Sequence, residues 1–383
     1  MNSQEISLEN MLGKTKYSIA ATIKSNKAAY FKSKKRIDDL FNLTDLEDIL
    51  EQPGIFENIR FNKDGKDINA YDTLDRQNNG HIHIPSFLLH LHKGETCIVH
   101  KTEHRSNKIR QLCVELTAIT KTPISCNIYL TPANQKAFPP HTDPHDVLVV
   151  QIAGKKEWNI EDRPKILHRR TMKSGDVLYI PKNTLHNAVS CESSEAYSMH
   201  LTFVIRKVYS EDLMAKYMTM SLDKDIENET DLSVQNLFNN KTSGYIENKI
   251  KRRGQNFDKE CYEKAANKLI DRLIDESVYV FNGSINSVLN FANNSNSINR
   301  DTMLKKSKNW YRTSGTENRV LIHLKHYELN IPFGITYVER LLGNDEKYQI
   351  KSLGNTDEEA YLIIISEILV KRGILVICDD QNN

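Results

Sequence analysis

Two histidines and one aspartate in this sequence have the types and the spacing to bind one metal ion. His141 and Asp143 are separated by one residue, so on an extended strand their side chains lie on the same face. His186, from a later segment, completes a set of two imidazoles and one carboxylate. Such a set suits non-haem iron(II) and leaves one face of the octahedron open. The spacing therefore predicts a metal centre with free coordination positions.

A histidine by itself is weak evidence, because the chain has 13 of them. The neighbouring sequence strengthens the case. Residues 175–181 read as a turn, a buried strand and a stop that delivers His186. Lys156 follows a tight turn and shares a strand face with Trp158. A lysine inside a barrel is costly to bury unless an anion pairs with it, and the distal carboxylate of 2-oxoglutarate is a suitable anion.

The segment that carries these residues reads as a β-rich unit. Between residues 124 and 206, short runs rich in Val, Ile, Tyr and Leu alternate with Gly and Pro turns. Many short strands at this spacing are typical of a β-barrel or sandwich, and not of a βαβ unit. The expected strands are Ser125–Thr131, Asp146–Ala153, Lys156–Ile160, Asp176–Ile180, Ala188–Cys191 and Tyr197–Ile205.

Helices are expected on both sides of this unit. After residue 205 the strands stop, and residues 317–383 read as three helices followed by a short strand, which is a winged-helix-like order. The other expectations from spacing are helices at 15–52, 86–92, 107–119, 208–223 and 257–280, a hairpin at 60–71, and linkers at 227–244 and 293–300.

Several motifs occur together and in a recognisable order. They are Asn127–Pro132, Phe138–Asp143, Val149–Trp158, Gly175–Pro181 leading to His186, and His200–Thr202. With these motifs the chain resembles the JmjC-type ribosomal oxygenases, which are cupin-4-like protein hydroxylases dependent on iron(II) and 2-oxoglutarate. The resemblance implies an α+β fold, with a double-stranded β-helix (cupin/JmjC) barrel and flanking helices.

The resemblance also implies a role for each residue of the predicted site. It makes His141, Asp143 and His186 the iron ligands. The residues that it implies for 2-oxoglutarate are Lys156, Asn127, Tyr129 and Thr202, with His200 as a further candidate. Independently of the family, Asn127 and Tyr129 are two residues apart on one expected strand, which permits both to face the barrel interior.

The implied activity is a hydroxylation in which 2-oxoglutarate and dioxygen are consumed and succinate and carbon dioxide are released. The expected substrate is an amino-acid side chain in a protein or peptide, with a ribosomal protein as the first candidate. Two alternatives stay open. One is a tailoring hydroxylase of a biosynthetic peptide or free amino acid, and the other is a non-catalytic cupin or winged-helix binding protein.

The resemblance extends over the whole chain and implies its domain organisation. Residues 1–206 correspond to the oxygenase domain with an N-terminal helical extension, 207–300 to a helical dimerisation region, and 301–383 to a winged-helix-like domain. A homodimer is therefore expected. One departure concerns the connection at 161–174, which reads as a loop shorter than is usual in the family and places residues 168–170 near the barrel mouth.

Three groups of residues are left without a firm role. His145 lies beside the expected ligands and is either a neighbour of the metal and substrate or a plain loop histidine. Six histidines between 81 and 104 are expected to line a groove or lie on the surface, with a second metal as the alternative. The basic run 249–253 is expected on a solvated helix face, with nucleic-acid contact as the alternative.

Composition limits the remaining choices. The formal net charge is only +2, which argues against a nucleic-acid-binding protein. The polar, acidic start does not resemble a secretory signal, and the longest apolar runs are far short of a membrane span. Six scattered cysteines without a CxxC pair suit reduced thiols in the cytoplasm, which is the expected location.

Overall fold

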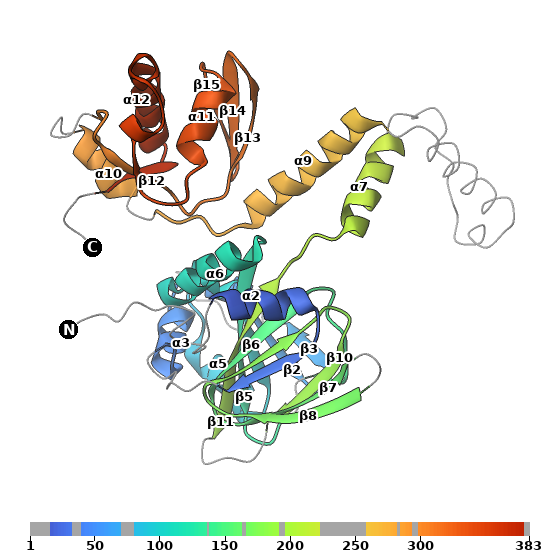
Figure 1. Ribbon diagram of the computed structural model, residues 1–383. Helices are drawn as coiled ribbons and strands as arrows, with labels where there is room; N and C mark the ends of the chain where they lie inside the picture. The colour runs from blue at the N-terminus through green and yellow to red at the C-terminus, as the bar shows by residue number, and fades with distance from the viewer. Residues whose placement is uncertain are drawn as a thin grey trace, which may run out of the picture. The chain divides into compact units, whose positions relative to one another are not determined.

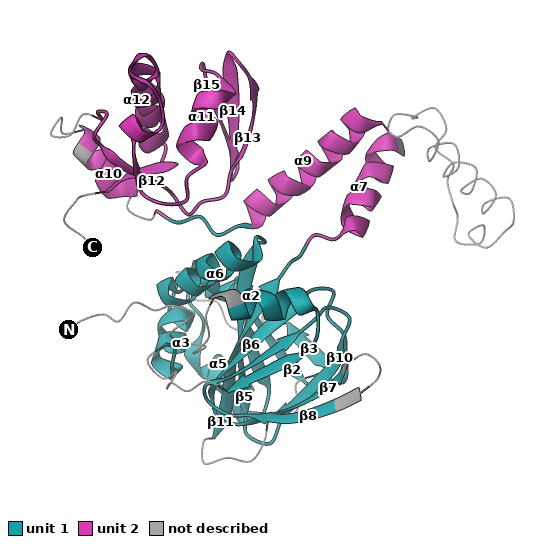
Figure 2. Ribbon diagram, viewed as in Figure 1, with its two compact units in different colours: residues 1–207, 277–280 teal, residues 208–276, 281–383 magenta. Residues whose placement is uncertain are grey.

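The computed structural model describes residues 16–32, 40–69, 80–135, 138–162, 166–190, 196–222, 258–281, 284–292 and 298–378. The chain divides into two compact units, coloured separately in Figure 2. Unit 1 comprises residues 1–207 and 277–280, and unit 2 comprises residues 208–276 and 281–383. The expected linker at 227–244, most of the linker at 293–300 and the basic run at 249–253 lie outside the described residues.

Unit 1 is built on two antiparallel sheets (Figure 1). Its strands are β1 (Ala29–Lys32), β2 (Ile59–Lys63), β3 (Lys66–Asn69), β4 (Thr96–Val99), β5 (Ile124–Pro132), β6 (Asp146–Ala153), β7 (Lys156–Asp162), β8 (Ile166–Met172), β9 (Asp176–Ile180), β10 (Leu185–Ser190) and β11 (Tyr197–Ile205). An eight-stranded sheet has the order β1-β9-β6-β11-β5-β4-β2-β3, and a three-stranded sheet has the order β10-β7-β8. This is the predicted cupin/JmjC-like barrel.

The two sheets pack against each other through their facing side chains. Val149 and Leu178 of the larger sheet form one buried cluster with Trp158, Ile160 and Met172 of the smaller sheet. The opposite face of the larger sheet is also covered. Strand β6 is therefore buried on both faces, which explains why its sequence is almost continuously apolar instead of alternating.

Four helices cover the outer face of the larger sheet: α2 (Lys16–Ser25), α3 (Leu43–Leu50), α5 (Ile84–His92) and α6 (Asn107–Thr120). Helix α6 begins after Ser106, whose hydroxyl accepts a hydrogen bond from the Ile109 amide. Its buried residues Ile109, Leu112 and Leu116 share one core with the outward-facing residues of β5, β6 and β11. The predicted helices at 86–92 and 107–119 and the hairpin at 60–71 are thereby confirmed.

Two expectations for unit 1 are wrong. Residues 166–172 form strand β8, where a loop was expected, and pair with all of β7 from Lys156↔Met172 to Asp162↔Ile166. The expected helical stretch 15–52 is interrupted by β1, which pairs with β9 at the edge of the larger sheet. In both places strand pairing, with the preceding strand for β8 and with a distant strand for β1, outweighs a weak local preference.

Unit 2 begins with two helices, α7 (Ser210–Leu222) and α9 (Lys259–Glu276), which pack against each other. The rest has its own apolar core. Its elements are α10 (Ser284–Ala292), β12 (Met303–Lys306), β13 (Arg312–Thr316), β14 (Arg319–Leu324), β15 (Tyr327–Ile331), α11 (Ile335–Leu342), β16 (Tyr348–Gln349), α12 (Thr356–Lys371) and β17 (Leu375–Ile377). Sheets β13-β14-β15 and β16-β12-β17 complete it.

The first of the three helices expected in 317–383 is wrong. Residues 319–331 form strands β14 and β15 instead. Val320, Ile322 and Leu324 are buried while the residues between them are not, so the apolar period is two and not 3.6. The two later helices and the final short strand are confirmed as α11, α12 and β17.

Candidate metal centre

The three side chains that were predicted to share one ion lie together. Potential ligand atoms of His141, Asp143 and His186 are all within 4.8 Å of one another. The distance from His141 Nε2 to Asp143 Oδ1 is 4.0 Å, and from His186 Nε2 to Asp143 Oδ2 it is 3.6 Å. In the described part of the chain this is the one group of three or more His, Cys, Asp or Glu residues with such geometry.

The ring nitrogens of both histidines are oriented for metal binding. Nδ1 of His141 lies 3.0 Å from the carbonyl oxygen of Pro139, and Nδ1 of His186 lies 2.9 Å from that of Thr184. A carbonyl only accepts hydrogen bonds, so each Nδ1 carries the proton and donates it. The lone pair is then on Nε2, which faces the shared gap, and this is the usual support for a metal-ligating histidine.

Main-chain hydrogen bonds hold the two ligand segments side by side. The His141 amide donates to the His186 carbonyl at 3.0 Å, and the reverse bond is 2.9 Å. The Asn183 amide donates to the Asp143 carbonyl at 2.8 Å. Residues far apart in sequence are thus placed by a local two-stranded ladder, which fixes the separation of their side chains.

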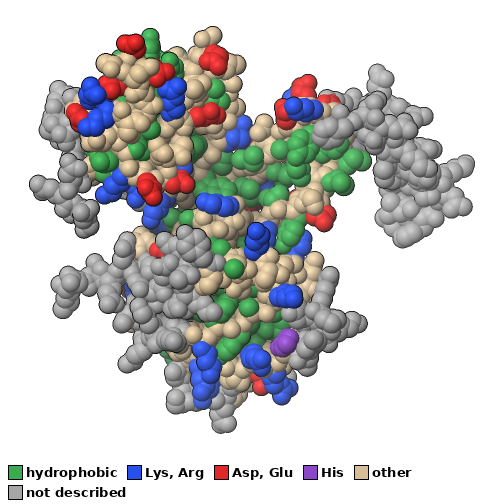
Figure 3. Space-filling model, in the orientation of Figure 1, with side chains coloured by type: hydrophobic (Ala, Val, Ile, Leu, Met, Phe, Trp, Pro, Cys, Tyr) green, Lys and Arg blue, Asp and Glu red, His purple; other side chains and the backbone are tan. Residues whose placement is uncertain are grey.

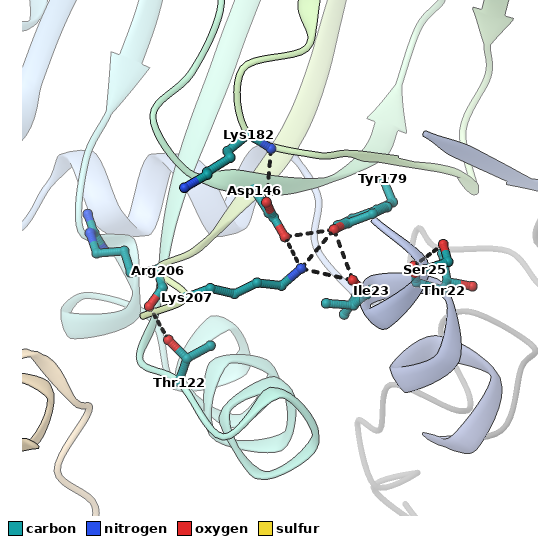
Figure 4. Close-up of polar contacts among 9 residues, drawn as sticks. All are labelled: Thr22, Ile23, Ser25, Thr122, Asp146, Tyr179, Lys182, Arg206 and Lys207. Carbon is teal, nitrogen blue, oxygen red and sulfur yellow. Dashed lines mark hydrogen bonds and ion pairs between the residues drawn. The ribbon is translucent and has the colours of Figure 1, made fainter. Parts of the chain in front are cut away.

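A buried carboxylate, Asp146, braces the same two segments (Figure 4). Its Oδ1 accepts from the Lys182 amide at 2.9 Å, and its Oδ2 accepts from the Tyr179 hydroxyl at 2.6 Å. The Lys207 ammonium forms an ion pair with Oδ2 and donates to the Ile23 carbonyl at 2.8 Å. In the sequence Asp146 is only the first residue of an expected strand. Its position as a fully buried acid at the start of a strand is what marks it.

Burial sets the protonation state near the triad. It lowers the pKa of His186, mainly by desolvation, so the neutral imidazole that binds metals is favoured at neutral pH. It also raises the pKa of Tyr129 to about 12, with a further contribution from the nearby Asp143 carboxylate. Tyr129 is therefore a hydrogen-bond donor and not an anion at neutral pH.

Lys156 is buried inside the barrel and has the features of an anion-binding residue. Its side chain is buried, with 2% exposed, and Nζ donates to Thr131 Oγ1 at 3.1 Å. Burial lowers its pKa from 10.5 to about 7, and no acidic side chain in the described part of the chain offsets this shift. An ammonium in that position lacks a counter-ion, so a carboxylate-bearing ligand fits it.

The other predicted cosubstrate residues lie on the same face of the larger sheet as Thr131, the residue to which Lys156 is hydrogen-bonded. Thr202 is directly opposite Asn127 on the neighbouring strand, and His200 is directly opposite Tyr129. The Tyr129 and His200 rings are stacked with centroids 4.7 Å apart. Trp158 from the smaller sheet meets His200 edge-on at 5.6 Å. These side chains therefore line one space between the sheets.

Several buried polar atoms of that space have no hydrogen-bond partner among the described residues. They are Trp158 Nε1, Ser190 Oγ and His200 Nδ1. Buried polar groups are rarely left unpaired in native proteins, so these atoms indicate that a polar ligand or water belongs there. Ser190 was missed in the sequence, although the alternation from His186 through Ala188 places it on the inward face of β10.

The remaining candidates are spread over the unit. His145 is half-buried beside Asp143, and burial lowers its pKa. His168 and Arg170 lie on strand β8, so their expected position in a loop is wrong. Of the histidines between 81 and 104, His90 is buried and pairs with Glu95 at 2.5 Å, contrary to the groove or surface position expected. Within the described residues none of these joins a second metal cluster.

Comparison with known proteins matches part of the chain. Residues 98–171 and 163–211 match the JmjC domain family. The bifunctional lysine-specific demethylase and histidyl-hydroxylase NO66 of Drosophila persimilis is 29% identical over 161 residues, which cover 37% of this chain and 23% of that protein. NO66 of Dictyostelium discoideum is 32% identical over 133 residues, covering 29% of this chain and 26% of that protein. The chain thus spans about a quarter of the length of these relatives.

Among solved structures, YcfD, a ribosomal oxygenase from Escherichia coli, is similar over 92% of this chain and 94% of its own. The TM-score is 0.49 and the sequence identity is 13%. The structure of YcfD in complex with cobalt and 2-oxoglutarate gives a TM-score of 0.47 at 13% identity, and covers 92% of this chain and 95% of that one.

Proposed function

We propose that this chain, which carries a JmjC domain within residues 98–211, is an iron(II)- and 2-oxoglutarate-dependent oxygenase that hydroxylates an amino-acid side chain in a protein or peptide. The observation that carries the proposal is the convergence of His141, Asp143 and His186 in a barrel that holds a buried lysine with no acidic partner among the described residues. A metal site alone fits many functions. A metal site in the same barrel as a buried cation fits a dicarboxylate-dependent oxygenase.

Each residue has a separate task in this reaction. When bound, iron(II) and 2-oxoglutarate supply the activation of dioxygen and the oxidation of a substrate C–H bond. His141, Asp143 and His186 hold the metal. Lys156 neutralises the distal carboxylate of the cosubstrate in a dry interior, where such a charge-assisted bond is strong.

Three polar side chains orient the cosubstrate along the barrel. Asn127 and Thr202 face each other on neighbouring strands, and Tyr129 lies between them and the Lys156 end. Because the pKa of Tyr129 is raised to about 12, its hydroxyl donates a hydrogen bond to a carboxylate at neutral pH. The buried walls around these groups exclude water from the reacting atoms.

The unequal exposure of the ligands supports a large substrate. The His141 and Asp143 side chains are 38% and 28% exposed, whereas the His186 side chain is 5% exposed. The space between the three ligands is thus open to solvent on the side of His141, where a side chain presented by a protein or peptide can approach. A ribosomal protein is the first candidate, and the histidyl-hydroxylase and ribosomal-oxygenase names of the relatives support that choice.

The test is product formation by the full chain. Incubation with iron(II), 2-oxoglutarate, ascorbate and peptides from ribosomal proteins should release succinate and add one oxygen atom to a peptide, as detected by mass spectrometry. His141→Ala and Asp143→Ala should abolish both signals, while Asp271→Asn in unit 2 should keep them. Normal turnover by His141→Ala would overturn the proposal.

We also propose that residues 207–300 form the dimerisation region of a homodimer. Helices α7 and α9 pack together and leave apolar side chains exposed, and hydrophobic side chains gather on them in Figure 3. Met214 is 66% exposed, Ile270 39% and Tyr262 37%. Exposed apolar side chains on one pair of helices support a protein interface there.

Residues 301–383 are proposed to form the winged-helix-like domain, supported by α11, α12 and the final strand β17 beside β12. Nucleic-acid binding is not proposed for this domain, because the formal net charge of the chain is only +2. No helix in the described part of the chain is long and apolar enough to span a bilayer. A cytoplasmic location is proposed from the scattered cysteines, of which Cys97, Cys113, Cys126 and Cys261 are buried free thiols.

A further inference from the structure

Ser190 lies inside the barrel, directly across from Lys156. It is the last residue of β10, and β10 pairs with β7 in the register Ser190↔Lys156 and Ala188↔Trp158. Side chains directly opposite on antiparallel strands share a face, with Cβ atoms about 5 Å apart. Because Lys156 and Trp158 point into the barrel, Ser190 points there as well.

The hydroxyl of Ser190 is buried without a partner. The residue is 2% exposed, and its Oγ makes no hydrogen bond within the described part of the chain. The residue on the other side of Lys156 in the same row is Met172, which is apolar and fully buried. Ser190 is therefore the polar neighbour of Lys156 across this smaller sheet, and its donor is free for a ligand.

A carboxylate at this end of the barrel needs more donors than Lys156 provides. Each carboxylate has about four lone-pair sites, and an ammonium has three donors. One donor of Lys156 is already engaged with Thr131 Oγ1 at 3.1 Å. Lys156 approaches from the smaller sheet and reaches toward the larger one, so a second donor that stays on the smaller sheet contacts the carboxylate from another direction.

From this geometry we propose that Ser190 Oγ donates a hydrogen bond to the distal carboxylate of 2-oxoglutarate and is a specificity-determining residue for that ligand. The inference rests on the proposed function and extends it to a residue outside the motifs that indicated the site. Lys156 supplies charge, which any acid attracts. Ser190 fixes the position of the distal carboxylate, so Lys156 and Ser190 together select a dicarboxylate of one chain length.

The test measures binding and not turnover. The full chain is loaded with manganese(II) under nitrogen, and 2-oxoglutarate is titrated by calorimetry into the unsubstituted protein and into Ser190→Ala. Loss of a hydrogen bond to a charged group should weaken binding about tenfold or more. Manganese(II) affinity, measured in the same way, should be unchanged, because Ser190 lies four residues beyond the ligand His186 along β10, which is about 13 Å of strand.

Two controls separate this effect from a general disturbance of the barrel. Thr102→Ala removes another buried hydroxyl of unit 1, one that already donates to the Cys126 main-chain carbonyl at 2.9 Å, and should leave 2-oxoglutarate affinity within about twofold. 2-Oxopentanoate has the same chain length without the distal carboxylate, and Ser190→Ala should bind it as the unsubstituted protein does.

The outcomes are distinguishable. Equal 2-oxoglutarate affinity in Ser190→Ala and the unsubstituted protein overturns the role of Ser190 and leaves the proposed function standing. Equal losses for 2-oxoglutarate and 2-oxopentanoate also overturn it, because the effect then lies away from the carboxylate. Failure of the unsubstituted protein to bind 2-oxoglutarate overturns both the inference and the proposed function.

Discussion

The main-chain amide of Lys182 donates a 2.9 Å hydrogen bond to the carboxylate of Asp146, and this bond joins the two segments that carry the candidate metal ligands. Asp146 follows Asp143 by three residues, and Lys182 precedes His186 by four. The carboxylate is held in turn by Tyr179 and Lys207. Asp146 therefore fixes both ligand-bearing segments relative to the larger sheet.

Asp146→Asn should weaken metal binding while the chain still folds. The amide keeps the size of the side chain but loses the ion pair with Lys207, so the segment before His186 is held less firmly. Loss of such an outer contact typically lowers metal affinity about 10- to 100-fold. Calorimetric titration with manganese(II) measures it. Asp271→Asn, which breaks the ion pair with Arg312 in unit 2, is the matched control and should leave metal affinity unchanged. Unchanged affinity in Asp146→Asn would show that the brace has no influence on the site.

Binding of 2-oxoglutarate should weaken as the pH rises above about 7. The pKa of Lys156 is lowered from 10.5 to about 7 by burial, so above that pH the free protein holds a neutral lysine and must take up a proton to pair with the carboxylate. Affinity should then fall on the order of tenfold per pH unit. Calorimetry in buffers of different ionisation enthalpy should detect up to about one proton taken up at pH 8. Lys156→Met should bind weakly at every pH and show no uptake.

The same shift gives the ligand-free protein the opposite pH dependence. Between pH 7 and 10.5 the unfolded chain has the lysine protonated while the folded chain does not, so the unfolded state binds more protons. The free energy of unfolding should therefore rise with pH through this window. Urea denaturation at pH 7 and pH 9 measures the change, and Lys156→Met should abolish this part of it. A free energy of unfolding that falls with pH equally in both proteins would contradict the assignment.

Ser190→Ala should stabilise the ligand-free protein even though it weakens cosubstrate binding. An unpaired buried hydroxyl costs about 1–3 kcal/mol, and its replacement by a methyl group removes that cost. Urea denaturation should show a rise of about 1 kcal/mol in the free energy of unfolding. Ser198→Ala should show the opposite sign, because its hydroxyl is bonded to Gln151. A loss of stability in Ser190→Ala would mean that its hydroxyl already has a partner.

Met214→Glu or Ile270→Glu should convert a homodimer into monomers. Both side chains lie on the α7–α9 pair and are well exposed in the single chain, so a charge there disrupts apolar association without disturbing the fold. Light scattering coupled to size-exclusion chromatography gives the mass directly. Ile364→Glu, at a similarly exposed position on α12 and outside residues 207–300, serves as the control and should remain dimeric. A monomeric unsubstituted protein would remove the dimerisation region from the proposal.

The local sequence predicts strand bounds and ligand positions correctly where one short pattern determines them. Strands β6, β9 and β11 begin and end where the apolar runs and the Gly or Pro turns predict. His141 and Asp143 share a face through simple alternation, and His186 is delivered by the turn–strand–stop of residues 175–181. For these features the information lies within a few residues of the feature itself.

The misses depend on strand pairing, or on contacts across the barrel, that no short sequence pattern shows. Strand β8 forms because its backbone pairs with β7. Strand β14 forms because it pairs with β13 on one side and β15 on the other, and its own residues alone do not reveal this pairing. Ser190 and Asp146 look unremarkable in the sequence. One matters because the register places it across from Lys156, and the other because Tyr179 and Lys207 converge on it. Such relationships arise only when the chain closes into a barrel.

The hydrogen bond from Lys156 to Thr131 also affects the rigidity of the barrel. Lys156 belongs to the smaller sheet and Thr131 to the larger one, so this hydrogen bond links the two walls of the barrel. A ligand that takes over part of this ammonium joins both walls at once. Ligand binding should therefore also make the protein more rigid. A diacid that binds more tightly should raise the thermal unfolding temperature further.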